Sequence, residues 1–227
     1  MTIRPHIGTL REKPLHAALK RWYFEPGDRV EQPMNGYVID LVRGDLLIEI
    51  QTRGFSSMKK KLAALLETHS VHVVHPVAIE KWIVKVDEAG AVLSRRKSPK
   101  RGTVLDVFGE LVSFPQLIDH PRFSVEVVLV REDEIRSFDA NRAWRRKGWV
   151  VDERRLIEVA DSIVLDSVEA LMSLLPVGLS PTFTTADIAE SLRASRRIAQ
   201  QMTYCLRNVG AIEMVDKDGN ALVYSLT

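Results

Sequence analysis

The sequence is poor in cysteine, has no long apolar run and carries almost no net charge. Cys205 is the only cysteine among 227 residues, which excludes an internal disulfide framework and a cysteine-rich zinc site. A lone cysteine fits a reducing compartment. No apolar run reaches the length that spans a bilayer, and the first residues lack the apolar core of a signal peptide. These absences predict a cytoplasmic protein without membrane association.

The charges are numerous but balanced. Lysine and arginine together number 32 against 30 aspartates and glutamates, which gives a formal net charge of +2. A chain with so small an excess does not attract nucleic acid as a whole, so any such binding has to come from local basic patches. The apolar fraction of 45% and the charged fraction of 27% are those of an ordinary globular protein.

Hydrophobic periodicity divides the chain into a larger α/β part and a smaller helical part. The larger part is expected over 1–137 as a mixed sheet flanked by helices, followed by a basic and aromatic connector over 138–165. Three helices and a hairpin are expected over 166–227. Within the larger part, the pattern predicts helices at 11–24, 56–68 and 104–112 and strands at 37–42, 45–52, 71–79, 82–86, 91–94 and 124–130.

The first hairpin carries a candidate metal site. If Arg43 and Gly44 form its turn, alternation places Asp40, Glu49 and Gln51 on one face. Asp40 and Glu49 then become diagonal neighbours, about 7–8 Å apart at the backbone, within reach of one shared ion. Carboxylates are the ligands that suit Mg²⁺ and Mn²⁺, and such an ion polarises a phosphoryl oxygen. The alternative is that both acids lie on the solvated face of an edge hairpin.

The run YVIDLVRGDLLIEIQTR, with its surroundings from residue 8 to residue 87, resembles the core of the PD-(D/E)xK nuclease superfamily. In that core, a helix with an acid precedes a strand ending in Asp, a strand with Glu-x-Lys and a second helix. The resemblance implies a restriction-endonuclease-like α/β fold and metal-dependent hydrolysis of DNA. It places Asp40 at the metal, Glu49 and Gln51 at the Glu-x-Lys pair, and Glu12 on the first helix as an assisting acid.

The usual lysine of that pair is replaced by Gln51. Glutamine hydrogen-bonds a water molecule but has no charge to stabilise a hydroxide. Lys59 and Lys60 on the next helix are candidates for the missing charge, and the alternative for both is a solvated helix face. Two hypotheses follow. The protein is a nuclease in which Gln51 positions water, or it is a catalytically silent nuclease fold that acts as a DNA-binding or protein-interaction factor.

Two basic segments are candidates for contact with DNA phosphates. The first is a polar loop at 94–102, for which a solvated surface is the alternative, and its cations are Arg95, Arg96, Lys97, Lys100 and Arg101. The second interleaves cations with Trp144 and Trp149. Such a pattern suits base stacking, and it equally suits tryptophan packed at a domain interface. The cations of this second segment are Arg142, Arg145, Arg146 and Lys147.

The C-terminal run TTADIAESL, a turn, SRRIAQQMTYCLRN and a final hairpin resemble a winged helix. The resemblance implies that the second helix enters the major groove of DNA with its N-terminal residues at the base edges. Cys205 falls on the buried stripe of that helix. Because winged helices also bind proteins, a homodimer or a protein partner is the alternative to DNA. The residues expected at the base edges are Ser195, Arg196, Arg197, Gln200 and Gln201.

Overall fold

The computed structural model describes residues 13–140, 142 and 147–227, and the chain forms two compact units. The first unit comprises Met1–Pro26, Ala78–Gly102 and Leu129–Asp161. The second comprises Gly27–Val77, Thr103–Val128 and Ser162–Thr227. None of the described helices is long and apolar enough to cross a membrane.

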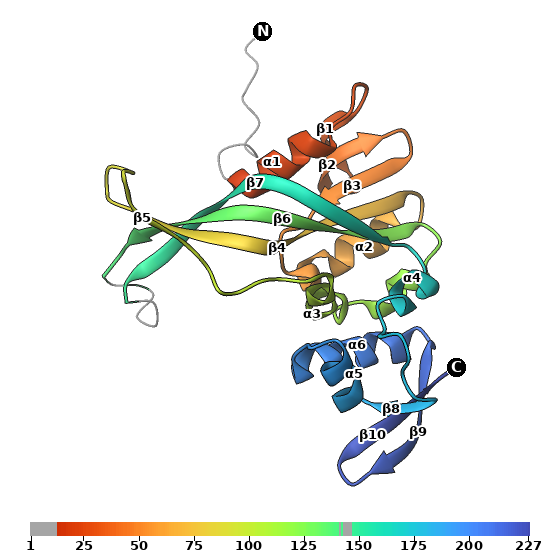
Figure 1. The fold of residues 1–227 in the computed structure, drawn as a ribbon. Helices are drawn as coiled ribbons and strands as arrows, with labels where there is room; N and C mark the ends of the chain where they lie inside the picture. Colours follow the sequence, from red (N-terminus) through yellow and green to blue (C-terminus); the bar gives the residue numbers. More distant parts are fainter. Residues whose placement is uncertain (1–12, 141, 143–146) are drawn as a thin grey trace. The chain divides into compact units, whose positions relative to one another are not determined.

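A large mixed sheet dominates the fold, in the order β1-β2-β3-β4-β6-β7, with β5 paired to β4. Its longest strands are β4 (Ser70–Val86), β6 (Phe123–Phe138) and β7 (Trp149–Leu165), which contribute residues to both units. Figure 1 shows these three strands side by side. The expected class of a mixed sheet flanked by helices is therefore confirmed.

In the second unit, β1 (Arg29–Met34), β2 (Tyr37–Arg43) and β3 (Leu46–Ile50) form an antiparallel meander, and β3 continues parallel to β4. Arg43 pairs with Leu46, so Gly44 and Asp45 form the turn. The prediction of an Arg43-Gly44 turn is wrong by one residue. Gly44 has a φ of +56°, a conformation that costs a glycine little.

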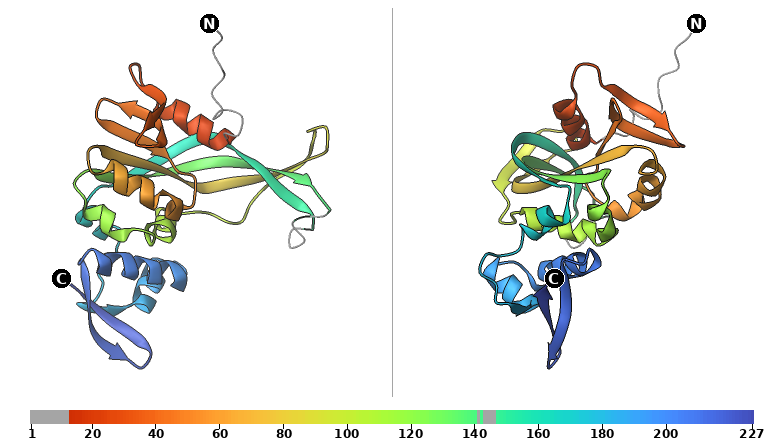
Figure 2. Two further views of the ribbon diagram at one scale, coloured as in Figure 1. Left: turned by 180° about the vertical axis from the view of Figure 1, so that it is seen from behind. Right: turned by 90° about the vertical axis from the view of Figure 1, so that its right-hand side faces the viewer.

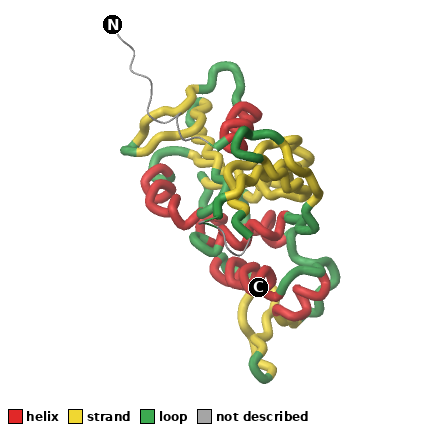
Figure 3. The backbone as a smooth tube through the Cα atoms, turned by 90° about the vertical axis from the view of Figure 1, so that its left-hand side faces the viewer, coloured by secondary structure: helices red, strands yellow, loops and turns green. Residues whose placement is uncertain are grey.

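Five short helices lie in the chain between β3 and β6. They are η2 (Phe55–Met58), α2 (Lys59–Leu65), η3 (Val104–Val107), α3 (Phe108–Leu111) and η4 (Pro115–Asp119), drawn as short red segments in Figure 3. Phe55 and Phe114 stack with ring centroids 5.5 Å apart and both are buried. Leu62 and Leu65 bury the apolar stripe of α2, so this helix has one buried and one solvated face.

The C-terminal part of the second unit contains α4 (Val168–Met172), α5 (Thr185–Ser191) and α6 (Arg196–Asn208), together with β8 (Thr182–Thr184), β9 (Ile212–Asp218) and β10 (Ala221–Leu226). The three strands form a small sheet in the order β8-β10-β9, and Figure 2 shows the β9–β10 hairpin projecting beyond α5 and α6. Cys205 is fully buried in α6, as expected, and this burial raises the pKa of its thiol to about 12.

The first unit contains α1 (Pro14–Tyr23), β5 (Val92–Lys97) and most of β6 and β7. It differs from the sequence prediction in three places. The strands expected at 71–79 and 82–86 are one continuous strand, β4. Much of the expected basic loop at 94–102 belongs to β5, and most of the expected connector at 138–165 belongs to β7. Neither strand shows the alternation of apolar and polar residues that marks a strand in a sequence, because charged side chains lie along both. These charges pair with the neighbouring strand, as Lys97 does with Glu80 and Arg154 with Glu132.

Candidate functional site

Asp40 on β2 and Glu49 on β3 lie together in the second unit. The pairing of Leu41 with Ile48, extended by one residue, puts Asp40 directly opposite Glu49 rather than diagonal to it. The amide of Ile50 donates to Oδ2 of Asp40 at 2.8 Å, and the amide of Asp40 donates to the Glu49 carboxylate. Each acid therefore binds the backbone of the opposite strand, and the negative charge of Asp40 acts on the Glu49 carboxyl.

The strand β1, which pairs with β2 on the side away from β3, has an irregular backbone next to Asp40. Residues 30 and 32 of β1 pair with residues 41 and 39 of β2, but the position between them is missing from the ladder. Glu31 occupies this position with a φ of +51°, in the left-handed region that a side chain such as glutamate rarely adopts. Strained backbone of this kind is common at functional sites, which singles out this stretch of β1.

Glu49 is buried, with 6% of its surface exposed. Burial raises the pKa of its carboxyl to about 7, the positive charge of Lys61 opposes that rise, and the negative charge of Asp40 adds to it. Oε1 of Glu49 is buried without a hydrogen bond of good geometry. A buried acidic oxygen of this kind favours a cation beside it.

Lys61 supplies one such cation. Its Nζ lies 2.6 Å from Oε1 of Glu49 and donates to the carbonyl of Val38 at 2.7 Å. Lys59 and Lys60, the lysines selected from the sequence, are exposed, so the alternative of a solvated helix face applies to them. The spacing of Lys61 from the buried Met58 and Leu65 is the signal that distinguishes it from its two neighbours.

The side chain of Gln51 binds the backbone of the turn that follows β3. Its Nε2 donates to the carbonyls of Arg53 and Gly54, at 2.7 and 3.3 Å. The prediction that Gln51 positions water therefore competes with a role in holding this turn. Glu110 of α3 holds the same turn from the other side, because its Oε2 accepts from the amides of Gly54 and Phe55 at 3.0 and 2.8 Å.

Asp40 and Glu49 fit a hard divalent cation in their chemistry, because both offer carboxylate oxygens, and Oε1 of Glu49 is paired with Lys61 in this structure. Glu12, the predicted assisting acid, lies outside the described residues. Among the residues that the structure describes, no three His, Cys, Asp or Glu side chains form a group able to hold a metal.

Two of the five predicted DNA-contacting residues of β5 and its neighbourhood are engaged within the first unit. Arg95 pairs with Asp133 and lies over the ring of Trp82, at 4.8 Å from its centroid. Lys97 pairs with Glu80 and also lies near Trp82. Arg96, Lys100 and Arg101 are exposed. Of the second basic set, Lys147 is exposed, whereas Arg145 and Arg146 lie outside the described residues.

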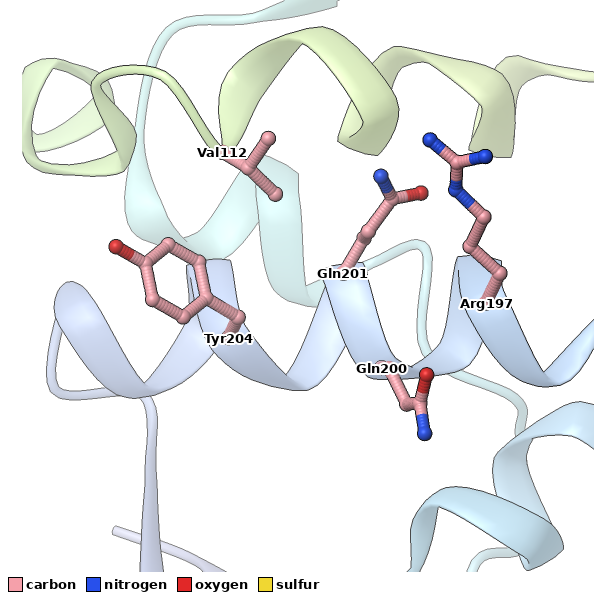
Figure 4. A pocket seen from close by; sticks show the side chains of 5 residues that line it. All are labelled: Val112, Arg197, Gln200, Gln201 and Tyr204. Carbon is pink, nitrogen blue, oxygen red and sulfur yellow. The ribbon is translucent and has the colours of Figure 1, made fainter.

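The predicted base-reading residues of α6 divide between two faces. Helix α6 packs against α3, η3 and η4 of the same unit. Arg197 and Gln201 point toward α3 in Figure 4, whereas Gln200 points away from it. A pocket of about 350 Å³ lies here, lined by Val112, Arg197, Gln200, Gln201 and Tyr204. Ser195 caps the helix by accepting from the amide of Ile198.

The other face of α6 borders an open cleft of about 560 Å³ beside the β9–β10 hairpin. Residues 196, 200, 203 and 207 follow one another at helical spacing along this face. The polar side chains lining the cleft include Arg196, Gln200, Thr203, Arg207 and Asn220. Two of the predicted residues, Arg196 and Gln200, thus lie in the cleft.

Comparison with known proteins identifies the family. The model of a domain of unknown function, DUF8091, matches residues 13–166. The chain belongs to the DUF8091 family. An uncharacterized protein of Treponema pallidum (strain Nichols) is 32% identical over 186 residues, which cover 82% of this DUF8091 chain and 74% of that protein. No solved structure is significantly similar to the chain. Asp40, Glu49 and Lys61 fall inside the matched range, and α5 and α6 fall outside it.

Proposed function

We propose that this DUF8091 protein is a metal-dependent nuclease of the PD-(D/E)xK type that hydrolyses phosphodiester bonds in DNA. The observation that carries the proposal is the meeting of Asp40, Glu49 and Lys61 on β2, β3 and α2. The order of the elements supports it, because a strand with Asp precedes a strand with Glu-x-Gln and then a helix. Resemblance in sequence and juxtaposition in space thus agree on Asp40 and Glu49, whereas Lys61 is added by the structure.

Asp40 and Glu49 would hold Mg²⁺ or Mn²⁺. When bound, such an ion supplies a Lewis acid for the phosphoryl oxygen and lowers the pKa of a water molecule. The buried position of Glu49 serves this role, because a carboxylate with a pKa near 7 exchanges its proton for a cation close to neutral pH. Asp40 adds the second negative charge that favours a divalent over a monovalent ion.

Lys61 supplies the positive charge that Gln51 lacks. An ammonium group 2.6 Å from the Glu49 carboxylate lies at the site itself, although it comes from α2 rather than from β3. At this place it stabilises negative charge that develops on a phosphate or on an attacking hydroxide. The departure of the sequence from Glu-x-Lys therefore does not leave the site without a cation.

The first test is metal binding by calorimetry. Asp40→Asn removes one of two adjacent negative charges, so we expect Mn²⁺ affinity to fall at least about tenfold. The exposed Asp45, in the turn of the same hairpin, provides the matched control Asp45→Asn, which should leave the affinity unchanged. Wild-type protein should also nick supercoiled plasmid with Mn²⁺ and not with EDTA. Binding that is insensitive to Asp40→Asn would contradict the metal site.

The cleft of α6 is the face that we propose for duplex DNA, in the manner of a winged helix. Arg196 and Arg207 lie at either end of its helical stripe and both line the cleft, where cations of this kind suit phosphate contacts. Arg197 and Gln201 face α3 instead, so the contact differs from the one that the sequence predicts. A protein partner at this cleft is the alternative, but its arginines and neutral polar side chains favour a polyanion.

Replacing Arg196 and Arg207 together by alanine should lower the salt dependence of duplex binding. Each phosphate contact contributes about 0.9 to the slope of log K against log salt, so the slope should fall by about 2. Fluorescence anisotropy with a labelled duplex in EDTA measures this slope. Arg197→Ala removes a cation from the opposite face and is the control, for which no change is expected. An equal effect of both variants would refute the assignment of the face.

A further inference from the structure

Phe138 ends β6 in the first unit, and 58% of its surface is exposed. Aromatic side chains this exposed are uncommon, because burial of the ring is a large source of stability. The ring lies where β6 turns back toward β7, and this turn is closed by the amide of Asp139, which donates to the carbonyl of Gly148 at 2.8 Å. We therefore ask which ligand would cover this exposed ring.

The ring of Phe138 is fixed although it is exposed. Gly148 has a φ of +81°, and a Cβ added there would lie 2.6 Å from Cε2 of Phe138. The ring therefore packs on the bare backbone of the glycine, closer than any other residue permits. Trp149 meets it edge-on, with centroids 5.7 Å apart and an interplanar angle of 69°. A ring held in this way presents its open surface without losing further rotational freedom on binding.

Three cations belong to this end of β4, β6 and β7 or to the turn between β6 and β7. Nζ of Lys85 lies 4.1 Å from the ring centroid of Trp149, and Arg142 and Lys147 are exposed in the turn. Within the described part of the chain, none of these three side chains forms an ion pair. The contrast with Arg95 and Lys97 is plain, because those two are paired with Asp133 and Glu80 and cover Trp82.

We propose that this aromatic tip, formed by Phe138, Trp149, Lys85, Arg142 and Lys147, binds single-stranded nucleic acid. An unpaired base stacks on Phe138, and the adjoining phosphates lie against the cations. A duplex does not fit this role, because its base faces are hidden in the stack. An apolar protein partner does not fit either, because three unpaired cations would be buried with it. The inference deepens the proposed function, on which it rests for nucleic acid as the partner, by naming substrates with an unpaired stretch.

The test measures binding of the full-length protein to a fluorescein-labelled oligothymidylate of about 20 nucleotides, in EDTA, by anisotropy. Phe138→Ala should weaken binding about tenfold, the effect of losing one stacked base. Phe138→Leu should weaken it equally, because it keeps the apolar volume and removes the ring, whereas Phe138→Tyr should restore wild-type affinity. Phe24→Ala removes another exposed aromatic ring of the same unit and should have no effect.

Three results would overturn this inference. The first is an unchanged oligothymidylate affinity in Phe138→Ala, and the second is an equal loss of affinity for a blunt duplex in that variant. The third is a wild-type protein that sediments as a dimer while Phe138→Ala sediments as a monomer, which would assign the tip to a second copy. Circular dichroism melts establish that each variant is folded. Because binding in EDTA requires no metal, a wild-type protein that binds oligothymidylate through Phe138 but does not nick plasmid would show failure of the proposed nuclease and not of this site.

Discussion

Replacing Lys61 by methionine is expected to slow plasmid nicking by about 10²–10³-fold, the effect of removing one preorganised charge from an active site. Methionine keeps the apolar stem that packs beside the stripe of α2 and removes only the ammonium group. The same substitution should move the acidic limb of the pH–rate profile to higher pH. The reason is that Lys61 lowers the pKa of the Glu49 carboxyl, and its loss removes that effect.

Lys60→Met is the matched control, because Lys60 belongs to the same helix and is exposed. It should nick plasmid at the wild-type rate with an unshifted pH profile. The shift of the profile is the discriminating measurement, since a variant that merely loosened the fold would lose rate without it. Equal rates for Lys60→Met and Lys61→Met would remove Lys61 from the site.

Glu49→Gln is expected to reduce nicking on the order of 10³-fold or more, because the metal loses an ionised ligand. The same change should make the metal-free protein more stable at high pH relative to wild type. Burial raises the folded pKa of Glu49 to about 7, above the 4.5 of an ordinary glutamate, so its contribution to stability is complete below the unfolded pKa and is lost as pH rises through 7. The full difference corresponds to about 3 kcal/mol.

Urea unfolding at several values between about pH 5 and about pH 8 measures this difference. The gap in unfolding free energy between Glu49→Gln and wild type should widen with pH and close again when Mn²⁺ is added, because only wild type binds the ion. Glu67→Gln removes an exposed carboxylate and serves as the control. Parallel pH curves for wild type and Glu49→Gln would show that Glu49 ionises as freely in the folded protein as in the unfolded chain.

The sequence predicts the first hairpin well, because strict alternation and a turn of polar residues are strong local signals. It misplaces the turn by one residue, since Gly44 has turn-forming neighbours on both sides. The strand β1 is missed altogether. Its sequence RVEQPM has a proline and three polar residues, and what makes it a strand is pairing with β2 rather than its own preference.

Lys61 shows why the site was only partly predictable. Three consecutive lysines are equivalent in composition, and only the phase of the helix separates the one that meets Glu49 from two that face water. The phase depends on where α2 begins, and the sequence does not fix helix ends to one residue. The two faces of α6 were unpredictable for another reason, because packing against α3 depends on contacts far apart in the chain.

The chain passes between its two compact units five times, at residues 26–27, 77–78, 102–103, 128–129 and 161–162. Neither unit is therefore a contiguous stretch that a gene fragment encodes. A polypeptide ended at residue 166, where the family match ends, would retain Asp40, Glu49 and Lys61. It would lose α6, which packs against α3, the helix whose Glu110 holds the turn after β3. Shortened proteins are thus poor substitutes for the whole chain in any assay. A chimaera of two relatives would have to exchange every segment of a unit together, with boundaries at all five crossings between the units.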